Sequence, residues 1–428
     1  MFASGCFGTA KHYGIVFAIM PATLTADSLR ICLAAFLRSL GVGMTGVLLA
    51  IYLSSVGWNV RTVGMLVTVG LSGVAVATLL TSFLADHAGR RRTLVVLGLL
   101  TALGALALAT TRRLELLLFA AFFGMINGLG RDRGPAYALE QALLPETTTP
   151  ERRTYLLAWY GLILDVGLAI GSLLAGVPAL LRGHWGWPQQ SAYSVAWFIS
   201  AALALGAAAL SATLSSRVEI AAPRLDGPRR LAPNITAESK RRIAKLAALT
   251  GMDSLGGGFL TSALLSYWFF RRFGIGEEWL GPLFFGARVA NAASHLVAAW
   301  LARRIGLVNT MVFTHIPSSV FLLAAALAPN FVWATALFLA REALVEMDVP
   351  TRQSYILAVV RPEERAFASG ITTLTRNVAY ALAPAGAGLA MSGVALASPL
   401  ILGAGTKIAY DLLLYFSFRR IRPPEELK

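Results

Sequence analysis

Charged residues occur at matched positions inside the apolar segments of this chain. A shift of 215 residues superposes the two halves and pairs three positions of opposite charge: Arg38 with Asp253, Arg131 with Glu346, and Arg133 with Asp348. An ionisable side chain inside an apolar segment costs several kcal/mol unless it is paired or in water. We therefore expect these pairs to close a cavity between the halves by ion pairing and to open it by separating, with Arg38 against Asp253 as the principal pair.

Asp253 is the first candidate for binding a proton. It stands alone in a glycine-rich stretch at 251–258, where a neighbouring group can come close to the backbone. A carboxylate in such a cavity binds a proton more readily once its cationic partner has moved away, so opening and protonation would be coupled. The alternative is a static salt bridge that only holds two helices together.

Asp348 and Glu346 are the next candidates for binding a proton. Arg352 lies one helical turn after Asp348, so an ion pair within that segment is the simpler interpretation of Asp348. Asp132 lies between two arginines and is expected to be their local partner. The predicted set of cavity and gate charges is Arg38, Arg131, Arg133, Asp132 and Arg352.

The remaining ionisable residues in apolar segments are expected to be structural. Lys407 and Asp411 are four residues apart and fit an ion pair on one face of a peripheral helix. His295 and His315 are expected to be packed or hydrogen-bonded away from the cavity. The histidines and cysteines lack metal-ligand spacing, and the sequence has no phosphate-binding loop or catalytic pair, so it predicts no metal, no cofactor and no enzymatic activity.

The elements that position these charges are predicted to be membrane-spanning helices. Of the residues, 56% are hydrophobic and only 14% are charged, and a spanning helix needs about 20 mostly apolar residues. Twelve segments qualify: 33–55, 62–84, 92–110, 114–138, 154–180, 191–214, 246–270, 279–301, 306–327, 331–357, 366–391 and 396–418. The predicted fold class is an all-α membrane protein with twelve transmembrane helices in two similar six-helix bundles.

The charges between the spans predict the orientation of the chain. The net charge of +15 comes mainly from basic residues in alternate loops, which is typical of the cytoplasmic side of a membrane and not of nucleic-acid binding. We expect a monomeric, multi-pass inner-membrane protein with both termini in the cytoplasm. The predicted domains are an N-terminal extension (1–32), a six-helix bundle (33–214), a cytoplasmic basic linker (215–245), a second six-helix bundle (246–418) and a cytoplasmic tail (419–428).

The loop after the second predicted span carries the most specific motif. Residues 84–92 read Leu-Ala-Asp-His-Ala-Gly-Arg-Arg-Arg, which resembles the signature loop of the major facilitator superfamily, G-x-L-a-D-r-x-G-r-r. Residues 301–306 hold a worn copy of it in the second half, Leu-Ala-Arg-Arg-Ile-Gly. With the twelve spans and the basic central linker, the resemblance covers nearly the whole chain without resolving a subfamily. It implies alternating access around a cavity lined mainly by the first, fourth, seventh and tenth spans.

The resemblance also implies a cytoplasmic latch formed by Asp86, Gly89, Arg90, Arg91 and Arg376. Asp86 would accept hydrogen bonds at the start of the eleventh span, where the helix dipole favours a carboxylate, and the arginines would hold neighbouring helix ends. Arg376 is placed at the start of that span as a gate residue. The alternative is that the arginines of the loop only anchor the cytoplasmic side of the membrane.

The function that the resemblance implies is secondary transport of a small organic molecule. We expect proton coupling through the candidate carboxylates. We also expect export, as by an efflux antiporter, rather than uptake, because the cavity helices look apolar apart from the charges. Two alternatives stay open: a passive facilitator would share the fold but lack a titrating carboxylate, and a membrane receptor would move nothing.

Overall fold

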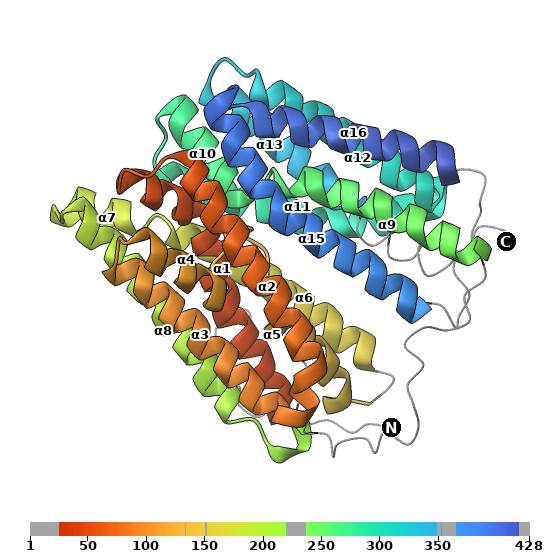
Figure 1. Ribbon diagram of the computed structural model, residues 1–428, viewed down its shortest axis with the longest axis horizontal. Helices are drawn as coiled ribbons and strands as arrows, with labels where there is room; N and C mark the ends of the chain where they lie inside the picture. The colour runs from red at the N-terminus through yellow and green to blue at the C-terminus, as the bar shows by residue number, and fades with distance from the viewer. Residues whose placement is uncertain are drawn as a thin grey trace, which may run out of the picture.

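The computed structural model describes residues 25–418 except 133, 150–151, 220–236, 349–351 and 353–364. Arg133, most of the predicted linker, the first 24 residues and the predicted tail therefore lie outside the described residues. Within the described part the regular structure is helical and contains no strand. The helices on either side of the linker form two bundles that lie side by side, with α1 to α8 in one and α9 to α16 in the other (Figure 1).

The helices of each bundle follow one another along the chain. The first bundle contains α1 (Ala26–Ser55), α2 (Val60–Ala88), α3 (Arg90–Thr110), α4 (Leu114–Phe123), α5 (Pro135–Leu143), η1 (Leu144–Thr147), α6 (Arg153–Leu174), α7 (Val177–Trp185), α8 (Gln189–Ala212) and η3 (Ser216–Val218). The second bundle contains α9 (Ala237–Gly258), α10 (Ser262–Phe273), α11 (Glu277–Ile305), α12 (Leu307–Ala326), α13 (Phe331–Val345), α15 (Arg365–Gly393) and α16 (Ser398–Phe418).

Helix starts are set by capping residues and lie outside the apolar spans. Thr25 caps α1, because its Oγ1 accepts a hydrogen bond from the N–H of Ser28 at 3.2 Å, and Asp27 adds an acidic group to the first turn. α1 therefore begins at Ala26, within the predicted N-terminal extension of 1–32. Similarly, α9 begins at Ala237, inside the predicted linker. Hydropathy locates the membrane-spanning part of a helix. The capping residues indicate where the polar turns beyond that part begin.

Seven described segments are long and apolar enough to cross a membrane by length and composition. One of them joins α6 and α7 as Tyr155–Trp185. The other predicted spans fall on helices that are shorter, more polar or interrupted. The fourth predicted span is divided between α4 and α5, and the seventh between α9 and α10. These interruptions correct the expectation of continuous helices there, and they occur in spans that were predicted to line the cavity.

The fourth span is interrupted by a non-helical stretch at residues 124–132 and 134, which we call the unwound segment. Met125 (φ 55°) and Gly130 (φ 69°) adopt left-handed backbone conformations, which a continuous helix cannot contain. Gly70 of α2 makes room for this segment, since a Cβ atom there would lie 1.7 Å from the carbonyl oxygen of Ile126. The absence of a side chain at this position thus lets α2 lie directly against exposed backbone.

The two bundles contact each other along α2 and α15, which lie side by side in Figure 1. The N–H of Ala385 donates to Oγ1 of Thr68 at 2.9 Å. The unwound segment joins the bundles as well, because the N–H of Ala263 donates to the carbonyl oxygen of Gly128 at 2.9 Å. The bundles diverge toward the side on which α1 begins and α16 ends (Figure 1). We call this the inner side and the opposite one the outer side.

Candidate functional site

A cavity bounded by the second bundle and by the unwound segment of the first is lined mostly by ionisable side chains. They come from the unwound segment, from six helices of the second bundle and from the connection after α13: Arg131, Asp253, Arg288, His315, Arg341, Glu342, Glu346, Asp348, Arg352, Arg376 and Lys407. All of these residues except Arg131 thus belong to the second bundle.

Asp253 contacts two of the cations of the charged lining. Its side chain is buried, and its two oxygens take different cations: Oδ2 lies 2.5 Å from Nη1 of Arg352, and Oδ1 lies 2.8 Å from Nζ of Lys407. Arg352 also lies 3.1 Å from Asp348, as the spacing of the two residues predicts. A buried carboxylate between two cations is a group whose protonation would release both of them.

The contacts of Asp253 extend through Lys407 to a histidine and a second aspartate. Nζ of Lys407 lies 3.2 Å from Nε2 of His315, and Nδ1 of the same ring lies 2.9 Å from Oδ1 of Asp411. We call these four residues, Asp253, Lys407, His315 and Asp411, the acid–base chain. Two predictions are corrected by these contacts, because Lys407 and Asp411 bind these other groups instead of each other, and because His315 lines the cavity.

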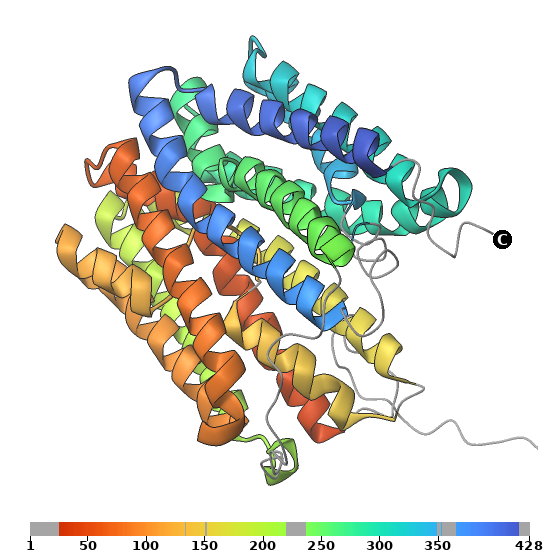
Figure 2. The same ribbon diagram turned by 45° about the vertical axis from the view of Figure 1, so that its right-hand side comes forward.

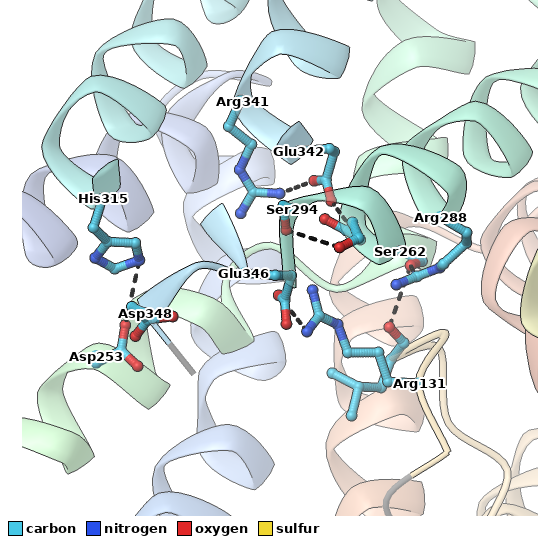
Figure 3. Close-up of polar contacts among 12 residues, drawn as sticks. Arg131, Asp253, Ser262, Arg288, Ser294, His315, Arg341, Glu342, Glu346 and Asp348 are labelled. Atoms are coloured by element: carbon cyan, nitrogen blue, oxygen red, sulfur yellow. Dashed lines mark hydrogen bonds and ion pairs between the residues drawn. The ribbon is translucent and has the colours of Figure 1, made fainter. Parts of the chain in front are cut away.

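Arg131 and Glu346 form an ion pair between the two bundles, and Figure 3 shows their side chains pointing toward each other. The superposition of the halves aligns these same two positions. Arg131 belongs to the unwound segment, and Glu346 directly follows α13. The third aligned pair, Arg133 with Asp348, includes a residue outside the described part of the chain.

Arg38 does not pair with Asp253 in this conformation, because both residues are bound within their own bundles. The guanidinium of Arg38 lies 2.7 Å from Asp132 and makes two parallel contacts of 2.6 Å with Glu140 of α5. Tyr160 donates a further hydrogen bond of 2.6 Å to Glu140. Such a bidentate pair is strong and directional, so Arg38 is held away from Asp253 in this conformation, in which the bundles diverge on the inner side. Their pairing in a closed inner gate stays a prediction.

The predicted latch residues are held by contacts within the first bundle. Asp86 accepts from Nε of Arg90 at 2.7 Å. The N–H groups of Arg90 and Arg91 donate to the carboxylate of Glu219 at 2.7 and 3.1 Å. Gly89 (φ 94°) permits the turn that aims these amides outward. Glu219 thus occupies the start of α3, a position that the sequence analysis did not assign to any carboxylate.

Arg376 lies in the cavity and not at a helix start. It stands 11 residues after Arg365, where α15 begins, and its Nε donates to Oγ of Ser254 at 3.3 Å. The predicted position at the start of the eleventh span is corrected because residue 376 lies about three turns inside α15. Arg376 joins the lining of the cavity, away from the latch loop.

On the outer side, ion pairs and hydrogen bonds join the bundles. Arg182 of α7 lies 2.6 Å from Glu277, the buried first residue of α11. Arg61 of α2 donates to Ser392 of α15 at 2.7 Å. Together with the divergence on the inner side, these contacts indicate a conformation that is closed on the outer side (Figure 2).

Replacing Glu277 by glutamine is expected to weaken the outer closure. The change removes the charge that holds Arg182, and for a partly exposed pair this costs up to about 1 kcal/mol, which shifts the balance of closed and open forms up to roughly 5-fold. Thr110 is the last residue of α3 and Val394 directly follows α15, and both are exposed. Spin labels at Thr110→Cys and Val394→Cys would report the outer separation by pulsed electron resonance. The exposed neighbour Glu278→Gln is the matched control, and identical distance distributions for the two variants would contradict the prediction.

Two similar helical bundles with a charged cavity between them define the chain as a protein of the secondary-transporter class. The model of the Major Facilitator Superfamily matches residues 31–384, and the chain belongs to this family. The family resemblance of the signature loop is thereby confirmed. The predicted fold class, an all-α membrane protein with twelve spans in two bundles, is confirmed with it.

Similar proteins cover nearly the whole chain. It is 25% identical over 413 residues to the uncharacterised membrane protein YJR124C of Saccharomyces cerevisiae, across 90% of this chain and 92% of that protein. A variant of the nucleoside transporter NupG superposes with a TM-score of 0.74 at 13% identity, over 91% of this chain and 99% of that one. The D-xylose-proton symporter gives 0.71 at 14% identity, over 94% and 99%. These structural likenesses establish the fold.

Proposed function

We propose that the protein is a proton-coupled secondary transporter that moves a small organic molecule by alternating access, with Asp253 as the coupling carboxylate. The observation that carries the proposal is the position of Asp253 in the cavity wall, buried between Arg352 and Lys407. The D-xylose-proton symporter, which shares the fold, couples a sugar to protons according to its name. That similarity supports proton-coupled transport as the class of mechanism. The assignment of the proton to Asp253 rests on the contacts of this chain's own residues.

Protonation of Asp253 would change the balance of charge in the cavity. A neutral Asp253 attracts Arg352 and Lys407 less, and Lys407 then has His315 as its other close partner. If the segments that carry these side chains move apart, the proton is bound more tightly, so proton binding and movement of the helices favour each other. Asp348 and Glu346, each in contact with an arginine, are the second candidates for this role.

The proposal names no direction of transport. Export was expected because the cavity helices look apolar in the sequence apart from a few charges. The cavity is instead lined by eleven ionisable residues, so that reason no longer applies. Direction depends on which gradients the membrane maintains, and the same proton-binding site serves an antiporter or a symporter.

Spin labels on the inner ends of the bundles test proton coupling without a known substrate. We choose His87→Cys on α2 and Ala244→Cys on α9, both exposed, in a chain whose two native cysteines are replaced by serine. Between about pH 5 and about pH 8, the inner distance in proteoliposomes is expected to shift. The Asp253→Asn variant should show the same distribution of inner distances at every pH. Glu115→Gln, which removes an exposed carboxylate at the start of α4, should keep the shift.

Two outcomes would overturn the proposal in different ways. A wild-type distance that does not depend on pH would exclude proton coupling of this movement and favour a passive facilitator. A shift that persists in Asp253→Asn would assign the coupling to another group, with His315 as the next residue of the acid–base chain to replace. A static salt bridge at Asp253 therefore predicts the second outcome.

A further inference from the structure

The ring of His315 joins two residues that lie one turn apart on α16. Lys407 and Asp411 are four residues apart, so they share one face of this helix. Nε2 of His315, on α12, lies 3.2 Å from Nζ of Lys407, and Nδ1 lies 2.9 and 3.0 Å from the two carboxylate oxygens of Asp411. All three side chains are buried. The imidazole therefore bridges a cation and a carboxylate within the acid–base chain.

These contacts determine which ring nitrogen of His315 carries the hydrogen. An ammonium group only donates hydrogen bonds, so Nε2, which faces Lys407, must accept one. A neutral imidazole has one donor and one acceptor, so its hydrogen lies on Nδ1 and is donated to Asp411. A doubly protonated ring would place an N–H group against the ammonium. The arrangement therefore fits a neutral ring that is oriented by Asp411.

Groups from several helices surround the His315 ring. Tyr410 of α16 packs against it edge-on, with the ring planes at 89° and the centroids 6.1 Å apart. Oδ1 of Asp253, on α9, lies 3.9 Å from Nε2, which is too far for a hydrogen bond, and Figure 3 shows the ring pointing toward this carboxylate. α11 and α13 also pack against α12. Their charged residues at the cavity are Arg288, Arg341 and Glu342.

Lys407 has two acceptors of different kinds. Its Nζ donates to the carboxylate of Asp253 at 2.8 Å and to the neutral ring of His315 at 3.2 Å. If Asp253 binds a proton, it attracts the ammonium less, and a buried cation without compensation is costly. His315 then remains as an acceptor, and the negative charge of Asp411 behind the ring strengthens that hydrogen bond. These two residues thus compensate the ammonium when Asp253 does not.

We propose that His315 and Asp411 are positioning residues that hold the ammonium of Lys407 while Asp253 is neutral, and that they thereby allow Asp253 to bind a proton. This inference rests on the proposed function, in which Asp253 is the coupling carboxylate. Loss of the acceptor weakens the form with neutral Asp253 more than the ionised form, because Lys407 keeps an anionic partner in the latter. A variant without this acceptor therefore needs a lower pH to protonate Asp253.

Two amide variants of His315 test this role, because they differ by one methylene group. Glutamine can place its side-chain oxygen where Nε2 of the ring lies and keep an acceptor for Lys407, whereas asparagine reaches only as far as Nδ1. With the spin labels at residues 87 and 244, His315→Asn should lower the pH midpoint of the distance change by about one unit. Asp411→Asn should lower it too. His315→Gln should stay near the midpoint of the labelled parent chain, as should His184→Asn at an exposed position of α7.

The position of the ring hydrogen gives a second measurement, which does not depend on movement of the helices. Histidine labelled with ¹⁵N in the ring is incorporated into the chain, and the signals of His315 are identified by their loss in His315→Gln. In proteoliposomes at about pH 8, magic-angle-spinning spectra should show a neutral ring with its hydrogen on Nδ1. A hydrogen on Nε2, or on both nitrogens, would overturn the proposal, because Lys407 would then face a donor.

The two measurements separate this inference from the proposed function. Equal midpoints for His315→Asn and His315→Gln, in a chain whose inner distance depends on pH, would reject the role of His315 and keep the proton-coupled transporter. A hydrogen on Nε2 in the same chain would do so as well. If the inner distance of the parent chain ignores pH, the proposed function is rejected, and this inference is rejected with it.

Discussion

Replacing Lys407 by methionine is expected to destabilise the protein by about 3 kcal/mol. Methionine keeps the length and apolar stem of the side chain but removes the cation that lies 2.8 Å from Asp253. Removing one partner of a buried ion pair costs roughly 3–5 kcal/mol, because the other charge stays buried without compensation. We expect the lower end of that range, since Arg352 still contacts the same carboxylate.

Thermal unfolding in detergent micelles would measure this loss, with Lys240→Met as the matched control because Lys240 is exposed in the first turn of α9. The double variant Lys407→Met with Asp253→Asn should recover much of the stability, because both charges are removed together. It should not recover the pH-dependent movement of the inner ends. Equal melting temperatures for the two lysine variants would show that Lys407 does not compensate the charge of Asp253.

Replacing Gly70 by alanine is expected to have the largest effect among changes that add only a methyl group. The new Cβ atom would lie 1.7 Å from the carbonyl oxygen of Ile126 and 2.7 Å from its carbon. The obstacle is backbone, and the N–H of Ile126 is already bonded to Ala121, so the unwound segment cannot move without losing that bond. Overpacking of this kind costs about 1–3 kcal/mol or more, which exceeds the gain of about 1 kcal/mol in helix propensity.

Gly161→Ala is the matched control, because nothing lies within 4 Å of a Cβ atom at that helical position of α6. We expect it to be neutral or to stabilise by up to about 1 kcal/mol, as the propensity difference alone predicts. The yield of monodisperse protein and the melting temperature of each variant check the comparison. If Gly70→Ala and Gly161→Ala have the same melting temperature, then α2 and the unwound segment do not touch at Gly70.

The bundle architecture and one contact between the halves could be predicted from the sequence. Apolar segments of sufficient length define most spans, and a shift between the halves aligns Arg131 with Glu346, which the structure brings together. That alignment works because equivalent positions in duplicated bundles face the same axis. In this conformation Arg38 is bound to Glu140, which belongs to a neighbouring helix of the same bundle, so its pairing with Asp253 stays a prediction.

The rest of the site depends on how each helix is rotated and where it is interrupted. Lys407 and His315 come from α16 and α12, spans expected to be peripheral, and only packing shows that their polar ends reach Asp253. The cost of burying a charge makes Lys407 a candidate for a functional site. Its four-residue spacing from Asp411 favoured a simpler interpretation, a structural ion pair on one face of a helix. Hydropathy also reads 114–138 as one span, although glycines at 124, 128, 130 and 134 signal the interruption.

The unwound segment also constrains how the chain enters the membrane during synthesis. α4 supplies only 10 residues, one of them the charged Glu115, which is about half of what a helix needs to cross the bilayer by itself. The following non-helical residues expose amides and carbonyls that lipid cannot satisfy, and Gly70 with other close neighbours shields them only after α2 is in place. This part of the chain must therefore insert together with earlier spans, so assembly of the first bundle is cooperative from its fourth span onward.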